Sequence, residues 1–322
     1  MIFIDGLECG VYDREIFEEL RAGQLSAIVN TVSFWEDAGE TLDRLGLWRD
    51  LIRENSDLVT MARTAADVEA ADAAGKTAII MGSQGSDLLD GRLRYVELFH
   101  DLGLRVMQLT YNNQNSLGSS CYEAVDSGLA RFGKEVVREM NAVGMLIDLS
   151  HVGNKTGLDT VDWSEQPVAI THANPSSLFP HARNKPDDLL RALAEKGGVL
   201  GLATYRNING DWVESVDKWC ELVKRTVDLI GIDHVAIGTD LGRKSGIPEL
   251  NWMRMGRWTR TPNYGAGSAA NPGKAKAVEW MADTTGFPVL AEALGRNGFA
   301  AGEVEAIMGG NWMRLYRTVF GG

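Results

Sequence analysis

The chain has few cysteines, no excess of positive charge and no long apolar run. Only three of its 322 residues are cysteine (Cys9, Cys121 and Cys220), and no two of them have the C-x-x-C spacing. Such an odd, widely spaced set excludes a disulfide framework or a zinc ribbon and suits a reducing compartment, so we expect free thiols. No segment holds the roughly eighteen uncharged apolar residues that a membrane span requires.

Basic residues are outnumbered, because 32 Lys and Arg stand against 44 Asp and Glu, for a net charge of −12. This balance argues against binding to nucleic acid or to an anionic membrane, and it favours a small-molecule partner. The opening MIFIDGLECG lacks a basic stretch followed by an apolar one, so we expect a cytoplasmic protein. With 44% hydrophobic and 24% charged residues, the composition is that of a globular enzyme and excludes disorder.

Short apolar, β-branched runs recur along the chain, and the segments between them are amphipathic. Nearly continuous apolar runs are typical of parallel strands buried on both faces, and several of the amphipathic helices end in the glycine that favours a helix C-cap. The eight runs are MIFID (1–5), SAIVNTVS (26–33), TAIIMGS (77–83), LRVMQLTY (104–111), MLIDLSH (145–151), PVAITH (167–172), GVLGLATY (198–205) and HVAIGTD (234–240).

Eight alternating strand and helix units predict an α/β chain folded as a (β/α)8 TIM barrel, with a doubly wound sheet as the main alternative. We expect residues 1–322 to form a single barrel domain. A long functional loop that could contain a short helix is expected after the eighth strand, at about 241–276, because this stretch is rich in Gly, Pro, Asn and Trp. Helices should follow it to the C-terminus.

Polar residues at the C-terminal ends of barrel strands line the active site in this fold. His151, His172 and Asp240 end the fifth, sixth and eighth predicted strands, and imidazole with carboxylate is the usual ligand set of a catalytic zinc ion. The simpler interpretation is a histidine satisfied by a loop carbonyl and an aspartate that caps a turn. The other candidates near strand ends are Glu8, Cys9, Gln84, Tyr111, Asn112 and Tyr205.

Two loop segments are further candidates for ligand binding. The Gly/Ser/Asn-rich stretch 110–128 offers the amide of Asn112, or it is an ordinary surface loop. Trp35, Glu36, Tyr111 and Trp258 would suit a cationic or methylated amine, with oligomer packing as the alternative.

Several long segments resemble the membrane (renal) dipeptidase family of the amidohydrolase superfamily, in a divergent bacterial-type form. They are GKEVVREMNAVGMLIDLSHVG, PVAITHANPSSL, PHARNKPDDLLRALAEKGGVLGL, VAIGTDLG and IMGGNWMRLYR. The resemblance implies a barrel, a dinuclear zinc site that activates water, and a homodimer. It also implies that His151 and His172 ligate the second metal, that Arg183 contacts a substrate carboxylate and that Asp240 is the catalytic acid or base.

The sequence departs from the family pattern at the first metal. Where the family has Asp-Gly-His-x-Asp, this chain has Asp5-Gly6-Leu7-Glu8-Cys9, and Gln84 replaces the bridging Glu. Tyr111 replaces a histidine that ends strand 4; it could donate a hydrogen bond to an oxyanion but not act as a base. Cys9 and Glu8 are the candidate replacement ligands, with a small buried side chain as the alternative for Cys9.

Three functions are compatible with these residues. The first is a hydrolase of a small amide or dipeptide-like substrate, with one Zn²⁺ on His151 and His172 and with Asp240 and Tyr111 catalytic. The second is a metal-independent lyase, isomerase or hydrolase of a small amino-acid derivative, and the third is a catalytically silent binding protein. The substrate is expected to contact Arg183, Asn112, Gln84, Trp35 and Tyr205.

Overall fold

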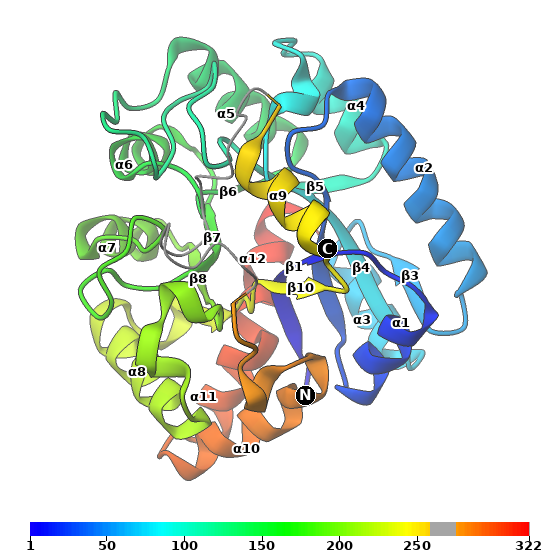
Figure 1. Cartoon of the computed structure of the whole chain (residues 1–322), viewed down its shortest axis with the longest axis vertical. Coiled ribbons are helices and arrows are strands. Elements are labelled where there is room, and N and C mark those ends of the chain that lie inside the picture. Colours follow the sequence, from blue (N-terminus) through cyan, green and yellow to red (C-terminus); the bar gives the residue numbers. More distant parts are fainter. Residues whose placement is uncertain (258–274, 322) are drawn as a thin grey trace.

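The computed structural model describes residues 1–257 and 275–321 and shows a ring of parallel strands surrounded by helices (Figure 1). The strands are β1 (Ile4–Gly10), β2 (Ala27–Ser33), β3 (Val59–Met61), β4 (Thr77–Ser83), β5 (Leu104–Gln108), β6 (Leu146–Asp148), β7 (Ala169–Ala173), β8 (Val199–Leu202), β9 (Val235–Ile237) and β10 (Leu241–Arg243). The helices are α1 (Arg14–Ala22), α2 (Ala38–Glu54), α3 (Ala65–Ala73), α4 (Tyr95–Asp101), α5 (Arg131–Val143), α6 (Asn154–Trp163), α7 (Asp187–Glu195), α8 (Val216–Ile230), α9 (Ile247–Met255), α10 (Phe287–Arg296), α11 (Ala301–Glu305) and α12 (Asn311–Val319).

The sheet order is β10-β1-β2-β4-β5-β6-β7-β8-β9, with every pairing parallel and β3 added beside β4. β9 and β10 are two parts of one barrel strand, the eighth, which is interrupted at residues 238–240. β9 pairs with β8 and β10 pairs with β1, so this eighth strand closes the ring. The predicted (β/α)8 barrel is therefore confirmed, and each of the eight predicted runs overlaps a strand of the ring, although β1 begins only at Ile4 and extends to Gly10, five residues beyond the predicted run.

Asp5 holds the closing seam between β1 and the eighth strand. Its carboxylate accepts hydrogen bonds from the backbone N–H of Thr239 at 2.8 Å and from the Thr239 hydroxyl at 2.5 Å. The backbone N–H of Asp240 donates to the Leu7 carbonyl at 3.2 Å. Burial raises the pKa of Asp5 to about 7, although the Thr239 hydrogen bonds oppose that change.

Close backbone approach at the seam requires glycine. A Cβ atom on Gly238 would lie 1.7 Å from the carbonyl oxygen of Thr171, a distance that no side chain tolerates. At the base of the barrel, the buried indole of Trp312 from α12 donates to the Ile237 carbonyl at 2.9 Å. This helix therefore fills the end of the barrel opposite the strand C-termini.

Apolar side chains form two layers, one inside the ring of strands and one between the strands and the helices. The inner one joins alternate strand residues such as Val29 and Ile80 to Trp312, and the outer one packs the remaining strand residues against the helices. This alternation explains why the strand runs are apolar on both faces. Among the described residues, no helix is long and apolar enough to cross a membrane.

The segment expected as a long loop that could contain a short helix begins with β10, which was not predicted, and with the short helix α9. Gly246 precedes α9 and Pro248 lies in its first turn, where a missing N–H costs nothing. Residues 258–274, which make up much of the expected loop, lie outside the described residues. Figure 1 shows α9 lying across the face of the barrel, above the strand ends.

Candidate active site

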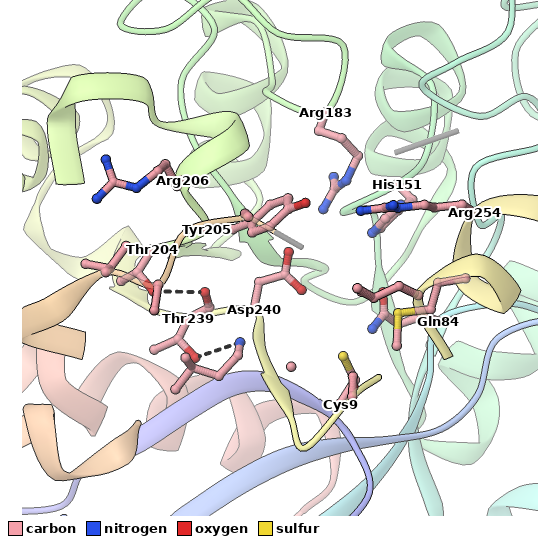
Figure 2. A pocket seen from close by; sticks show the side chains of 18 of the residues that line it. Cys9, Gln84, His151, Arg183, Thr204, Tyr205, Arg206, Thr239, Asp240 and Arg254 are labelled. Atoms are coloured by element: carbon pink, nitrogen blue, oxygen red, sulfur yellow. Dashed lines mark hydrogen bonds between the residues drawn. The ribbon is translucent and has the colours of Figure 1, made fainter. Parts of the chain in front are cut away.

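A cavity of about 220 Å³ opens at the C-terminal ends of the strands, where the fold places functional side chains (Figure 2). Residues from the strand ends form its floor, and α9 contributes one wall through Leu250, Met253 and Arg254. Of the residues predicted from the sequence, the cavity is lined by Cys9, Gln84, Tyr111, Asn112, His151, Arg183, Tyr205 and Asp240.

His151 lines the cavity and meets His172, which is fully buried and does not line it. Their Nε2 atoms are 3.1 Å apart, and both side chains are buried, with His172 behind His151. Nδ1 of His151 lies 2.6 Å from Oδ1 of Asn112, which is an acceptor. His151 must therefore carry its proton on Nδ1, which leaves a lone pair on Nε2.

The tautomer of His172 is set by a buried chain of hydrogen bonds from β6 and β7. The Thr171 hydroxyl lies 2.8 Å from His172 Nδ1 and donates to Oδ2 of Asp148 at 2.8 Å. Oδ1 of Asp148 accepts from the backbone N–H of Thr171 and from both the N–H and the hydroxyl of Ser150. Burial raises the pKa of Asp148, and the hydrogen bonds from Ser150 and Thr171 oppose that rise. When Asp148 is ionised, the Thr171 hydroxyl donates to it and the Thr171 oxygen accepts the Nδ1 proton of His172.

With His172 protonated on Nδ1, both neutral imidazoles present an Nε2 lone pair to the same space. Burial lowers the pKa of both histidines well below the usual value, and the nearby cations Arg183 and Lys185 lower it further. At 3.1 Å the two Nε2 atoms share a hydrogen bond when one of them is protonated, and when both are unprotonated they are close enough to bind one ion at about 2.0–2.1 Å from each. The arrangement is what a divalent metal ion requires of two imidazole ligands.

Asp240 lies across the cavity in the interruption between β9 and β10. Its backbone is left-handed, with φ of 62°, a conformation that is uncommon for residues other than glycine but that aspartate and asparagine adopt most readily. Burial raises the pKa of its carboxyl to about 6, and the positive charge of Arg183 partly offsets the rise. A carboxylate with a pKa in this range is suited to exchange protons near neutrality.

Arg183 is buried, and backbone groups fix its guanidinium. It donates to the carbonyl oxygens of Ser150 and His172, the latter at 3.0 Å. Two of its five N–H groups are used in this way, and the side chain lines the cavity. It can therefore present further donors to an anionic group of a ligand.

An aromatic wall lies beside His151. The Tyr111 ring packs 4.4 Å from the His151 ring and 5.1 Å from both Phe34 and Trp35. Trp35 was predicted to touch substrate, but it is buried behind Tyr111 and does not line the cavity. Trp258, the other predicted aromatic, lies outside the described residues.

Glu8 does not join the histidine pair. Alternation along β1 turns its carboxylate away from the cavity, where Oε2 accepts from the Tyr12 hydroxyl at 2.9 Å and lies 3.8 Å from the Arg243 guanidinium. The proposed replacement ligand is therefore a buried structural carboxylate. Cys9 does face the cavity, but burial and the nearby Asp240 and Glu8 carboxylates raise the pKa of its thiol and oppose the thiolate that zinc needs.

Gln84 and Asn112 are both oriented by the protein. Gln84 Nε2 donates to the Thr31 hydroxyl at 2.9 Å, and its side chain faces the cavity. Asn112 was predicted to bind substrate; its amide oxygen instead holds His151, and its left-handed backbone, with φ of 57°, places it there. Within residues 1–257 and 275–321, no three His, Cys, Asp or Glu side chains gather as a complete metal-ligand set.

Several participants were missed by reasoning from strand ends. Asp148, Thr171 and Ser150 act through His172, and only the buried aspartate in DLSH gave a hint of them. Arg254 was also missed, because the segment that carries it was expected to be a long loop.

Comparisons with known proteins agree with this geometry. The sequence model described as membrane dipeptidase (peptidase family M19) matches residues 14–253. Dipeptidase tcpJ of Claviceps purpurea is 29% identical over 289 residues, which are 87% of this chain and 60% of the relative. Dipeptidase verJ of Clonostachys rogersoniana is 30% identical over 208 residues, which are 64% of this chain and 54% of the relative. The chain thus spans little more than half the length of these curated relatives.

Solved structures show the same architecture over the whole chain. An amidohydrolase from Pseudomonas aeruginosa is 37% identical with a TM-score of 0.94, and the match covers 100% of this chain and 97% of that one. A metallo peptidase from Rhodobacter sphaeroides, liganded with a phosphinate mimic of the dipeptide L-Ala-D-Ala, is 19% identical with a TM-score of 0.79, and the match covers 99% of both chains. The second likeness supports the barrel fold alone.

Proposed function

Because the chain belongs to the membrane dipeptidase family, we propose that it hydrolyses the amide bond of a small dipeptide-like substrate with a reduced metal site. The observation that carries this proposal is the pair of imidazole nitrogens, 3.1 Å apart, whose lone pairs face the same space. Several buried hydrogen bonds are needed to fix the tautomers of both rings. The fixed tautomers leave both Nε2 atoms able to bind a cation.

The residues fit one metal ion and not two. His151 and His172 would hold one divalent ion, for which Zn²⁺ is the natural choice. When bound, such an ion polarises an amide carbonyl and makes a water molecule more acidic. At the first site of the family, Leu7 offers no donor atom, Gln84 offers an uncharged amide, and Cys9 is held as a neutral thiol. Ordinary dinuclear chemistry is therefore not part of the proposal.

The remaining groups of the cavity divide the work of hydrolysis. Asp240 takes a proton from the attacking water and returns it to the leaving amine. Arg183 binds a substrate carboxylate through the N–H groups that do not donate to the carbonyl oxygens of Ser150 and His172. Tyr111 donates a hydrogen bond to the oxygen that gains negative charge, and Gln84 with Tyr205 orients the substrate.

Assembly and location are part of the same proposal. The resemblance to the family supports a homodimer, and gel filtration with light scattering tests it. All three cysteines are unpaired, which supports a reducing compartment such as the cytoplasm.

The test is the zinc content of protein purified without chelator, measured together with turnover of neutral dipeptides. We expect about one ion per chain, lost in His172→Ala, and a metal affinity reduced about 10- to 100-fold in Asn112→Ala, which removes the acceptor that orients His151. Asn112→Asp keeps that acceptor and should retain the metal.

Other outcomes would change the assignment. Turnover that survives in metal-free wild type and in His172→Ala would replace the proposal with the metal-independent enzyme. Two ions per chain would show that Cys9 or Gln84 has taken over a lost ligand position. Metal binding without any turnover would favour the third candidate function, a catalytically silent binding protein.

A further inference from the structure

The side-chain amide of Gln84 has a fixed orientation at the wall of the cavity. The residue is only 2% exposed, and it lines the cavity. Its Nε2 donates to the Thr31 hydroxyl at 2.9 Å, and that hydroxyl donates its own proton to the Glu8 carbonyl oxygen at 3.2 Å. Because the Thr31 oxygen can then only accept, the amide nitrogen of Gln84 must face Thr31 and the amide oxygen must lie at the other end.

The amide oxygen of Gln84 is directed at the contents of the cavity. Within the part of the chain that the structure describes, no group donates a hydrogen bond to this Oε1 atom. An acceptor in a buried wall costs free energy when it is left unpaired. The cavity is therefore built to receive a ligand with a hydrogen-bond donor at this position.

The backbone of Gln84 is fixed on both sides, which gives the acceptor a defined position relative to the histidine pair. Its N–H donates to the Ser33 carbonyl oxygen at 3.0 Å, and its own carbonyl oxygen accepts from Nε2 of Gln108. Oε1 of the same Gln108 accepts from the backbone N–H of His151 at 3.0 Å. A ligand group that binds Gln84 is thus held in register with His151.

The neighbouring strand ends add a negative charge to this part of the cavity. Gln84 follows β4, Cys9 lies in β1 and Asp240 precedes β10, and these strands are close neighbours in the ring. Figure 2 shows the three side chains around the lower part of the cavity, below Arg183 and Arg254. The charge of Asp240 is one of the causes that raise the pKa of the Cys9 thiol, so these two groups are close and Cys9 stays neutral. Asp240 is therefore the charged member of the three.

A free ammonium group matches both features of this part of the cavity. It donates hydrogen bonds, as the Gln84 oxygen requires, and its positive charge is attracted by Asp240. A peptide N–H or a hydroxyl also donates a hydrogen bond, but neither carries the charge. The carboxylate at the other end of a small zwitterion would reach Arg183.

We propose that the substrate has a free α-ammonium group that donates a hydrogen bond to Oε1 of Gln84, while its carboxylate binds Arg183. This rests on the proposed hydrolase function and makes Gln84 the residue that selects unacylated substrates. The amide that replaces the bridging glutamate of the family thus binds a cation of the substrate in place of a metal ion.

The test compares L-alanylglycine with N-propionylglycine at pH 7. The two compounds share the amide N–H and the carboxylate, and only the first has the ammonium group. We expect kcat/KM to favour L-alanylglycine about 10- to 100-fold. Gln84→Met keeps the length of the side chain without its amide oxygen, and it should reduce that ratio to about 3 or less.

Two further variants separate recognition by Gln84 from a general effect on the fold. Gln114→Met is the matched control, because Gln114 is exposed in the loop after β5 and does not line the cavity; it should leave the ratio unchanged. Thr31→Val removes the hydroxyl that orients the amide and should lower the ratio at least about threefold. An unchanged ratio in folded Gln84→Met, or in Thr31→Val if Gln84→Met does not fold, would overturn the assignment of Gln84.

The two proposals can fail independently. Equal kcat/KM for both compounds in wild type would overturn the ammonium site and leave the hydrolase function intact. If neither compound is hydrolysed, calorimetry with the same pair decides. Tighter binding of L-alanylglycine by about tenfold or more, lost in Gln84→Met, would retain the ammonium site and reject the hydrolase. Equal binding of both compounds, or binding of neither, would reject the ammonium site.

Discussion

At the scale of single residues, the site depends on groups whose ordinary chemistry is changed by burial. Asp240 is the clearest case, because its carboxyl lies in a left-handed interruption of the closing strand and its pKa is raised to about 6. His151 and His172, in contrast, are kept neutral by the same cause. The site therefore pairs neutral bases with one acid that titrates near physiological pH.

The pH dependence of turnover should report Asp240. As pH falls through about 6, this carboxyl takes up a proton and can no longer act as a base, so kcat/KM should fall about tenfold per unit below that value. A pH–rate profile with metal kept saturating measures this. Asp240→Asn should lower kcat by about 10²- to 10⁴-fold. A profile that stays flat between about pH 4.5 and 8 would show that another group carries the proton.

Sequence reasoning located the residues but not their orientations. His151, His172 and Asp240 could be predicted because parallel strands bring their C-terminal ends to one edge. The function of Asn112 could not, because it depends on a left-handed backbone that places the amide against an imidazole. Glu8 and Trp35 were misplaced for a related reason: near a strand end, one residue of register decides between cavity and core.

At the scale of elements, α9 is the part of the site that the barrel pattern does not contain. Nine residues of mixed polarity between Gly246 and Gly256 show only weak helical periodicity, so the sequence predicts a long loop with at most a short helix and does not locate α9. Its position is set by contacts at both ends of the helix. The Trp252 indole donates to Oε1 of the buried Glu36 at 3.1 Å, and the same oxygen pairs with Arg44 at 2.6 Å.

Loosening α9 should affect substrate binding more than folding. Trp252→Phe keeps an aromatic ring and removes the hydrogen bond to the Glu36 carboxylate. Hydrogen bonds to charged groups contribute about 1.5–3 kcal/mol. We expect KM to rise about 3- to 10-fold, with the melting temperature changed by less than about 1 °C. Steady-state kinetics and calorimetric melting measure both quantities. A large fall in melting temperature would instead make α9 part of the cooperative core.

At the scale of the whole molecule, the barrel is closed by buried carboxyl groups. Asp5 holds Thr239, and Glu8 lies beside Arg243 on β10. Burial raises the pKa of Glu8 to about 8, although Arg243 lowers it. The closing seam therefore consists of acids that the fold prefers to keep protonated.

Stability should consequently fall as the medium becomes alkaline. Between its unfolded pKa near 4.5 and its folded pKa of about 8, Glu8 is protonated in the folded state and ionised in the unfolded state, so the free energy of unfolding decreases as pH rises. Glu8→Gln removes this term, and its melting temperature relative to wild type should rise by about 2–4 °C between pH 5 and pH 8. Glu19→Gln should weaken this pH dependence without abolishing it, because the charge of Glu19, which also pairs with Arg243, is one of the causes that raise the pKa of Glu8. Parallel melting curves for wild type and Glu8→Gln would contradict this account.

The position of the seam also has a consequence for how the protein is made. Asp5 and Thr239, whose contact closes the ring, are 234 residues apart, so on the ribosome the first strand waits on the order of tens of seconds for its last neighbour. During that interval β1 has an open edge, and neither Asp240 nor α9 has been synthesised. The candidate site is therefore incomplete until the last part of the chain is made, and the unpaired edge of β1 is the segment that a cotranslational chaperone would protect.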